Sequence, residues 1–224
     1  MSKFFFICSL LFLFGCSDSA LDKESKSTIN EAESQESDNP KEVFKKFKTA
    51  LSNKDGDLAV QYVTAETIWY YELCRKWALG TEDVDFDSLQ TLDVIMIFHL
   101  RYRLKESELS KMDGASLFTW GVDEGMIDEN TVIDMEINKT QIEGDRAIST
   151  ILFKGQPSDE ITLDFTKQNG EWKFEMIPLM EVAEKSLAKI VQQSGKTKVE
   201  LAVFLLEKEY KEEIPPSILN GPVQ

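Results

Sequence analysis

One stretch decides the fold class of this chain: FTKQNGEWKF, residues 165–174. Trp172 and Phe174 alternate with polar residues after Asn169-Gly170, a dipeptide favoured at the tight turn of a β-hairpin, and Phe165 ends a similar alternation before it. Because successive side chains of a strand point to opposite faces, we expect one face of this hairpin to be buried and the other to be solvated. The stretch therefore predicts an antiparallel sheet that covers a core on one side.

The same alternation extends upstream of the hairpin to about residue 132. A second turn signal, Gly144-Asp145, precedes a strand over 146–153, so we expect an antiparallel meander. The residues expected on its buried face are Ile133, Met135, Ile137, Ile161, Leu163, Phe165, Trp172, Phe174 and Met176. None of these side chains can transfer a proton. The carboxylates between them are expected on the solvated face, where burial does not tune a pKa: Asp134, Glu136, Asp164 and Glu171.

Helical patterns precede and follow the predicted sheet. Asn39-Pro40 is a start signal for the first helix, Thr64 is expected to cap the third, and Asp87 is expected to cap the fourth. The predicted helices are 40–53, a short one around 58–63, 65–79, 88–104 and 114–124 before the sheet, and 180–193 and 197–212 after it. The order predicts an α+β fold, with N-terminal helices packed on an antiparallel sheet and extra C-terminal helices.

The first sixteen residues carry a targeting signal. Lys3 precedes an apolar run of eleven residues, Phe4 to Phe14, which is too short to span a bilayer. The run ends in Leu13-Phe14-Gly15-Cys16, which resembles the lipobox of bacterial lipoproteins. That resemblance implies that residues 1–15 are a lipoprotein signal peptide and that Cys16 is the lipid-attachment site, so that acyl chains anchor the protein to a membrane. The alternative is an ordinary secretory signal followed by an unmodified cysteine.

The segment after the lipid-attachment site has the composition of a tether. Residues 17–40 contain seven acidic residues, two lysines, six serines and no aromatic residue. Such a segment cannot bury enough apolar surface to offset the entropy of ordering it, so residues 16–40 are expected to be a disordered acidic tether. Ser17, rather than aspartate, follows the cysteine. This favours the outer membrane within the cell envelope of a Gram-negative host.

The composition excludes two kinds of function. A formal charge of −15 repels the phosphate backbone of nucleic acids, so no nucleic-acid partner is expected. One histidine and three cysteines cannot build the usual structural zinc cluster. The chain also contains no glycine-rich phosphate loop, and no cofactor is expected.

Three segments carry a resemblance to a known superfamily: PKEVFKKF at 40–47, NKDGD at 53–57 and the hairpin at 165–174. Together with the order of helices and strands they are similar to the nuclear transport factor 2-like and ketosteroid-isomerase-like superfamily. The resemblance implies a cone made of helices and a curved antiparallel sheet over residues 41–179, followed by a C-terminal helical extension with a Pro-rich tail over 180–224. That superfamily contains isomerases, dehydratases and protein-binding modules, so the fold does not decide the function.

Four residues are candidates for a pocket: Trp69, Tyr71, His99 and Arg103. Aromatic walls are typical of sites for apolar ligands, and His99 lies on an apolar helical stripe that continues to Arg103. The alternative for His99 is a packed residue whose nitrogens are hydrogen-bonded.

Two hypotheses about function follow. The first is a lipid-anchored envelope protein without enzymatic activity, which binds a protein partner or a small apolar ligand. The second is a cavity enzyme of isomerase or hydrolase type. In addition, the apolar face over 199–206 is a candidate interface for a homodimer.

Overall fold

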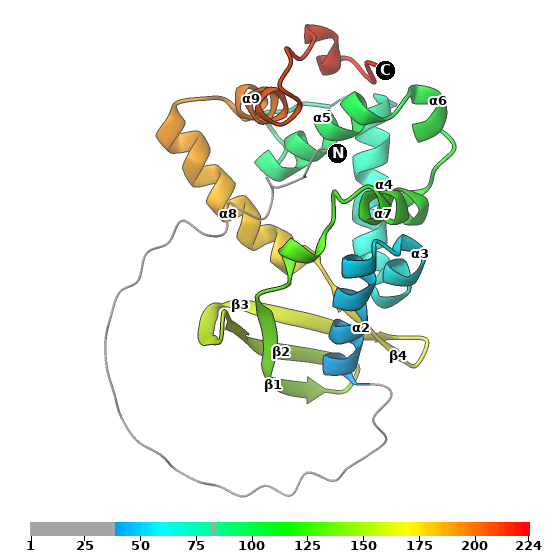
Figure 1. The fold of residues 1–224 in the computed structure, drawn as a ribbon, viewed down its shortest axis with the longest axis vertical. Helices are drawn as coiled ribbons and strands as arrows, with labels where there is room; N and C mark the ends of the chain where they lie inside the picture. Colours follow the sequence, from blue (N-terminus) through cyan, green and yellow to red (C-terminus); the bar gives the residue numbers. More distant parts are fainter. Residues whose placement is uncertain (1–38, 82–83) are drawn as a thin grey trace, which may run out of the picture.

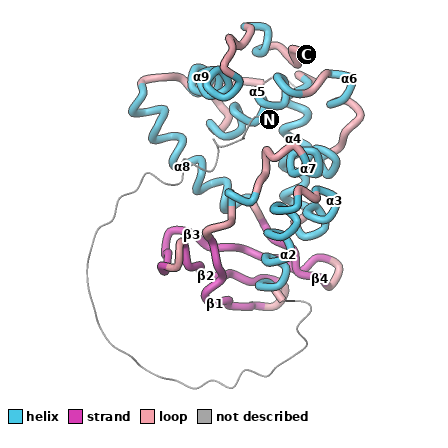
Figure 2. Tube along the Cα trace, viewed as in Figure 1, coloured by secondary structure: helices cyan, strands magenta, loops and turns pink. Residues whose placement is uncertain are grey.

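The computed structural model of the protein describes residues 39–81 and 84–224. The predicted signal peptide, Cys16 and nearly all of the predicted tether lie outside the described residues. Within the described ranges, no helix combines the length and the hydropathy needed to cross a bilayer. Most of the helices gather at one end of the molecule and the strands at the other (Figure 2).

Eight α-helices, three short 3-10 helices and four strands make up the described ranges. The helices before the sheet are α2 (Pro40–Asn53), α3 (Gly56–Ala59), η2 (Val60–Tyr62), α4 (Ala65–Leu79), α5 (Thr91–Arg103), α6 (Glu106–Leu109), α7 (Gly114–Asp123) and η3 (Glu129–Thr131). The strands are β1 (Met135–Glu143), β2 (Arg146–Phe153), β3 (Gln156–Gln168) and β4 (Glu171–Glu175). The helices after the sheet are α8 (Ile177–Ser194), α9 (Lys198–Tyr210) and η4 (Pro216–Leu219).

The strands form one curved antiparallel sheet in the order β1-β2-β3-β4 (Figure 1). This confirms the α+β fold class and the meander predicted from the turn signals. Asn169 and Gly170 both have positive φ, 55° and 87°, which is what a tight hairpin turn that follows the twist of its strands requires. The hairpin at 165–174 therefore forms for the local reason that the sequence indicated.

The inner face of the sheet differs from the prediction at Ile133, whose side chain is 47% exposed. Ile133 lies in the turn between η3 and β1, before the alternation of the strand begins. Val132, at 1% exposure, occupies the buried position instead. The prediction for Ile133 was wrong because the period of two was extended into a turn.

The first helix, α2, lies across the inner face of the sheet. The ring centroids of Phe44 and Phe47 are 5.4 and 5.3 Å from that of Phe174 in β4. Asn39 caps the helix, since its side chain accepts a hydrogen bond from the backbone N–H of Glu42 at 3.0 Å. Both the start of α2 and its buried stripe were predicted from the sequence.

The outer edge of β4 is covered by the segment that leads into α4. Val63 forms a parallel bridge with Phe174, and the backbone N–H of Thr64 donates to the carbonyl of Phe174 at 3.1 Å. Thr64 is also the N-cap of α4, as predicted, and its hydroxyl donates to the carboxylate of Glu175 at 2.7 Å. One residue thus joins the start of a helix to the edge of the sheet.

The central helix is α5, in which every residue from Thr91 to Arg101 is buried. The prediction that Asp87 caps this helix was wrong, because the helix begins four residues later. The backbone N–H groups of Thr91 and Leu92 donate to the carboxylate of Glu184 in α8 at 3.0 and 2.8 Å. A carboxylate at a helix N-terminus is favourable, but this one comes from a distant part of the chain.

The predicted C-terminal extension packs into the same core as the rest. Its expected boundary between residues 179 and 180 falls inside α8. In α9, the buried residues Leu201, Ala202, Leu205 and Leu206 belong to the common hydrophobic cluster, and α9 packs against α5. The face predicted as a subunit interface is therefore mostly internal, and Phe204 is its large exposed residue, at 38%.

Candidate binding pocket

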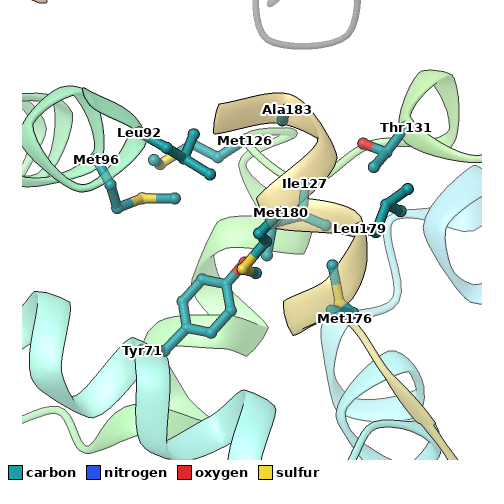
Figure 3. Close-up of a pocket in the computed structure, with 10 residues that line it drawn as sticks. All are labelled: Tyr71, Leu92, Met96, Met126, Ile127, Thr131, Met176, Leu179, Met180 and Ala183. Atoms are coloured by element: carbon teal, nitrogen blue, oxygen red, sulfur yellow. The ribbon is translucent and has the colours of Figure 1, made fainter. Parts of the chain in front are cut away.

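An apolar pocket opens where α4, α5 and α8 meet the segment that connects α7 to β1 (Figure 3). Its lining residues are Tyr71, Leu92, Met96, Met126, Ile127, Thr131, Met176, Leu179, Met180 and Ala183. No carboxylate, amine, guanidinium or imidazole is among them. The cavity has a volume of about 70 Å³. We call it the methionine pocket.

Four of the seven methionines of the chain line this pocket. They come from separate elements: Met96 from α5, Met126 from the connecting segment, Met176 from the end of the sheet and Met180 from α8. A methionine side chain is unbranched and polarisable, so it adapts to differently shaped partners better than a branched residue does. The walls of the pocket are thus suited to admitting an apolar group and adjusting to it.

The pocket also holds a buried hydroxyl. Tyr71 is 3% exposed, and its ring rises from α4 toward Met180 in Figure 3. Its hydroxyl has no hydrogen-bond partner among the described residues, whereas the neighbouring Tyr70 donates to Asp93 at 2.9 Å. Burial raises the pKa of the Tyr71 hydroxyl, so this group stays protonated and can donate a hydrogen bond. An apolar ligand with one acceptor atom would satisfy it.

The structure brings only one of the four predicted pocket residues to the methionine pocket. Tyr71 lines it. Trp69 is 55% exposed, with the ammonium of Lys76 at 5.0 Å from its ring. His99 and Arg103 lie farther along α5, on the side that faces α9.

His99 is enclosed by the end of α9. Its Nε2 lies 3.6 Å from Oε2 of Glu209, and its Nδ1 lies 3.5 Å from the hydroxyl of Tyr210. The side chains of His99 and Glu209 are 3% and 6% exposed. Arg103 adjoins the pair, and its guanidinium donates to Glu124 at 2.6 Å. The packed role proposed for His99 therefore has a specific partner, Glu209.

Burial shifts the two members of this pair in the directions that keep both of them uncharged. Burial, with the nearby Arg103 as a smaller cause, lowers the pKa of His99 to about 3. Burial raises the pKa of Glu209 to about 7, although Arg103 acts in the opposite direction. Oε1 of Glu209 is buried and has no hydrogen-bond partner among the described residues. A neutral pair can stay in this interface at a lower cost than two charges.

Sequence reasoning missed Glu209 and the gathering of the methionines. Glu209 follows Leu205 by four residues and Leu206 by three, so it lies on the apolar stripe of α9, where an acidic residue is a signal of a buried partner. The methionines gave no such signal, because they are up to 84 positions apart and come together only through tertiary packing.

Two other chemistries find no support in the described residues. Cys74 is fully buried and burial raises the pKa of its thiol, so the reactive thiolate is disfavoured. Within residues 39–81 and 84–224, no three side chains of histidine, cysteine, aspartate or glutamate are placed to hold a metal ion.

Comparison of the chain with models of known protein families, with curated proteins and with solved structures found no match.

Proposed function

We propose that this chain is a lipoprotein of a bacterial cell envelope whose folded part binds an apolar group of another molecule in the methionine pocket, without catalysing a reaction on it. The observation that carries the binding role is an apolar pocket with adaptable walls, into which the hydroxyl of Tyr71 points. The similarity of Leu13-Phe14-Gly15-Cys16 to a lipobox supports the anchor, and Ser17 supports the outer membrane if the host has one. The resemblance to the nuclear transport factor 2-like superfamily is part of the same proposal.

The separation of pocket and charge supports binding rather than catalysis. A cavity enzyme of isomerase or hydrolase type needs a proton-transfer group within reach of its substrate. The buried groups suited to that task, His99 and Glu209, are enclosed at the contact between α5 and α9 and line no part of the methionine pocket. If His99 were nevertheless a catalytic base, His99→Gln would abolish a turnover once a substrate was found.

The size of the cavity limits what enters it. An engineered cavity of about 150 Å³ in another protein accepts one benzene molecule, and the methionine pocket, at about 70 Å³, is roughly half as large. A linear or branched aliphatic group fits such a space better than an aromatic ring does. We therefore expect the end of a lipid chain or an aliphatic side chain of a partner, with an acceptor atom that reaches Tyr71.

The experiment that tests the pocket uses the mature chain with ¹³C-labelled methionine methyl groups and 1-hexanol as the probe. We expect the methyl signals of Met96, Met126, Met176 and Met180 to shift together and to saturate. The signals of Met112 and Met135, which do not line the pocket, serve as internal controls. Shifts that do not saturate, or that affect all six methionines equally, would contradict the proposal.

A matched pair of variants on α8 sharpens this test. Ala183→Phe places a ring in the pocket, because Ala183 lines it, and is expected to remove the response to hexanol. Ala188→Phe adds the same ring at an exposed position of the same helix and is expected to leave the response unchanged. An equal response in both variants would exclude the methionine pocket as the binding site.

The anchor has its own test. Cys16→Ser removes the sulfur that would carry diacylglycerol, so incorporation of labelled palmitate is expected to stop and the protein to leave the membrane fraction. If label and membrane association persist, Cys16 is not the lipid-attachment site. This result does not depend on the hexanol experiment.

A further inference from the structure

The two edge strands of the sheet differ in whether another segment pairs with them. At one edge, Val63 and Thr64 cover β4 by pairing with Phe174. At the other edge, no strand among the described residues pairs with the outer side of β1. An uncovered edge strand presents backbone N–H and C=O groups to which another extended segment can add.

A groove runs along this free edge between β1 and α2. Its lining residues are Lys41, Phe44, Lys45, Lys48, Thr49 and Ser52 from α2 and Met135, Glu136 and Ile137 from β1. Its volume is about 470 Å³, several times that of the methionine pocket. We call it the lysine groove. Figure 1 shows α2 and β1 beside each other at this end of the sheet.

Lys48 shows which way the edge of β1 faces. Its ammonium donates to the carbonyl of Ile133 at 3.0 Å and to that of Met135 at 2.9 Å. At least these two carbonyls therefore point out of the sheet and into the lysine groove. The ammonium occupies the place that donors of a neighbouring strand would take, but only at the start of β1.

Beyond Lys48 no described residue covers the inner face of β1 at Ile142. Thr140 and Ile142 are paired with Ser149 and Ala147, which are 0% and 2% exposed and face the core. Directly paired residues of antiparallel strands share a face, so Thr140 and Ile142 also lie on the inner face. Ile142 is nevertheless 53% exposed. Ile142 is thus an apolar side chain on the inner face of the sheet that no described residue buries.

The charge of the groove is opposite to that of the chain. Two exposed lysines, Lys41 and Lys45, lie one helical turn apart on the wall formed by α2, and the acidic side chain that lines the groove is Glu136. The whole chain carries a formal charge of −15. Lys45 lies 3.7 Å from Glu42, its one acidic neighbour within ion-pair distance among residues 39–81 and 84–224, and its side chain stays 73% exposed. Such a pair is worth little in water and leaves the ammonium able to take another partner.

We propose that an extended acidic segment of a partner polypeptide lies in the lysine groove and continues past it along the free edge of β1, where it pairs as a further strand with residues 139–143, which lie beyond the groove lining. Backbone hydrogen bonds to residues 139–143 would supply affinity, and acidic side chains beside Lys41 and Lys45 would supply specificity. An anionic membrane surface would use the lysines but not the edge of a strand, which is why a polypeptide fits the groove better. The β-bulge between Ile137 and Lys139 interrupts the edge, so pairing is confined to the part of β1 that follows it.

The test uses the full mature chain and a labelled probe peptide of about ten alternating glutamate and threonine residues, a usual strand length. We expect saturable binding by fluorescence anisotropy and slower amide exchange in residues 139–143. A second probe with the same side chains but with alternate backbone nitrogens methylated cannot form the ladder and should bind at least about tenfold more weakly. Equal binding of both probes would overturn strand addition.

Matched charge reversals test the lysines. Lys41→Glu with Lys45→Glu should weaken binding of the unmethylated probe by about tenfold or more, since two attractions become repulsions. Lys185→Glu with Lys189→Glu makes the same change at the same spacing on exposed positions of α8 and should have a much smaller effect. Equal weakening by the two double variants would overturn the proposal. So would lysine-dependent binding to vesicles of anionic lipid without binding of the peptide. Neither outcome bears on the methionine pocket.

Discussion

The two ends of α5 bury opposite kinds of chemistry. Near its N-terminus, Leu92 and Met96 line a pocket that has no charged side chain. Near its C-terminus, His99 and Arg101 are equally buried, at 2% each, but are enclosed by hydrogen-bonding partners. The methionine pocket and the packed polar side chains thus lie at opposite ends of one helix.

A buried ionisable residue is therefore not in itself a sign of an active site. Arg101 donates to the backbone carbonyls of Trp77, Ala78, Ile218 and Leu219 at 2.7 to 3.0 Å. It thereby joins α5 to the end of α4 and to the C-terminal segment. Buried polar groups whose neighbours fill the space around them hold parts of a chain together, whereas a binding site needs open space.

The largest effect is expected at the polar end. Arg101→Leu would remove the side-chain donor to four backbone carbonyls, of which only that of Trp77 keeps another donor among the described residues, the N–H of Gly80 at 3.2 Å, and should lower the free energy of unfolding by about 3–5 kcal/mol. Urea denaturation measures it, and exposed Arg146→Leu is the control, with an expected change within about 0.5 kcal/mol. Similar losses in both variants would remove Arg101 as the link between α5 and the C-terminal segment.

At the apolar end the expected loss is smaller, because part of the space is already empty. Met96→Ala should cost about 2 kcal/mol, at the low end for buried methionine, and should enlarge the methionine pocket. The enlarged pocket should bind 1-octanol more tightly than the wild-type pocket does. Met112→Ala, outside the pocket, should leave alcohol binding unchanged. If Met96→Ala also leaves it unchanged, the space beside α5 is not the site.

The pair of His99 and Glu209 predicts opposite pH dependences that offset each other. Burial raises the pKa of Glu209 in the folded chain to about 7, from an ordinary value of 4.5. Between these values the folded state binds more protons, so stability falls as pH rises. Burial lowers the pKa of His99 in the folded chain to about 3, from an ordinary value of 6.5. Between those values the unfolded state binds more protons, so stability rises with pH.

The two slopes overlap between about pH 4.5 and 6.5, and their sum should be nearly flat there. Arg103 and Tyr210 face the same pair and stay in place in both variants. In Glu209→Gln the slope of His99 remains, so stability should rise with pH over this window. In His99→Gln the slope of Glu209 remains, so stability should fall with pH. Urea midpoints measured across the window decide between them. If the two variants share one slope, the pair is not electrostatically linked to folding as described.

The smallest change in stability is expected when the hydroxyl of Tyr71 or of its neighbour Tyr70 is removed. Tyr71→Phe removes a hydroxyl that makes no hydrogen bond to another described residue, so the stability of the ligand-free chain should change by no more than about 1 kcal/mol. Tyr70→Phe removes the donor to Asp93 and should destabilise the chain by about 1–2 kcal/mol. Tyr71→Phe should also weaken binding of 1-hexanol. A loss of stability in Tyr71→Phe equal to that in Tyr70→Phe would mean that the Tyr71 hydroxyl is already satisfied.

Predictions from the sequence succeeded where a short segment contains its own reason for its structure. Asn39, Thr64 and Asn169-Gly170 were correctly assigned as two caps and a turn, since the groups that they satisfy or the dihedral angles that they allow lie within three residues. They failed at Asp87, because the N-cap of α5 is Gln90. The backbone N–H of Gln90 donates to Asp93, while Glu184 of α8 accepts from the next two N–H groups. Of the four residues predicted to form a pocket, Tyr71 is the one that lines the methionine pocket.

Periods of 2 and 3.6 residues and local capping signals were enough to predict the α+β class, the order of the main helices and strands and most of the residues that they bury. The meeting of four methionines beside the Tyr71 hydroxyl, the contact of His99 with Glu209 and the edge of β1 that no described strand covers are seen only in the folded structure. Each of these depends on how distant elements pack together. No local pattern encodes such a juxtaposition, since its free energy is realised only when the whole chain has folded.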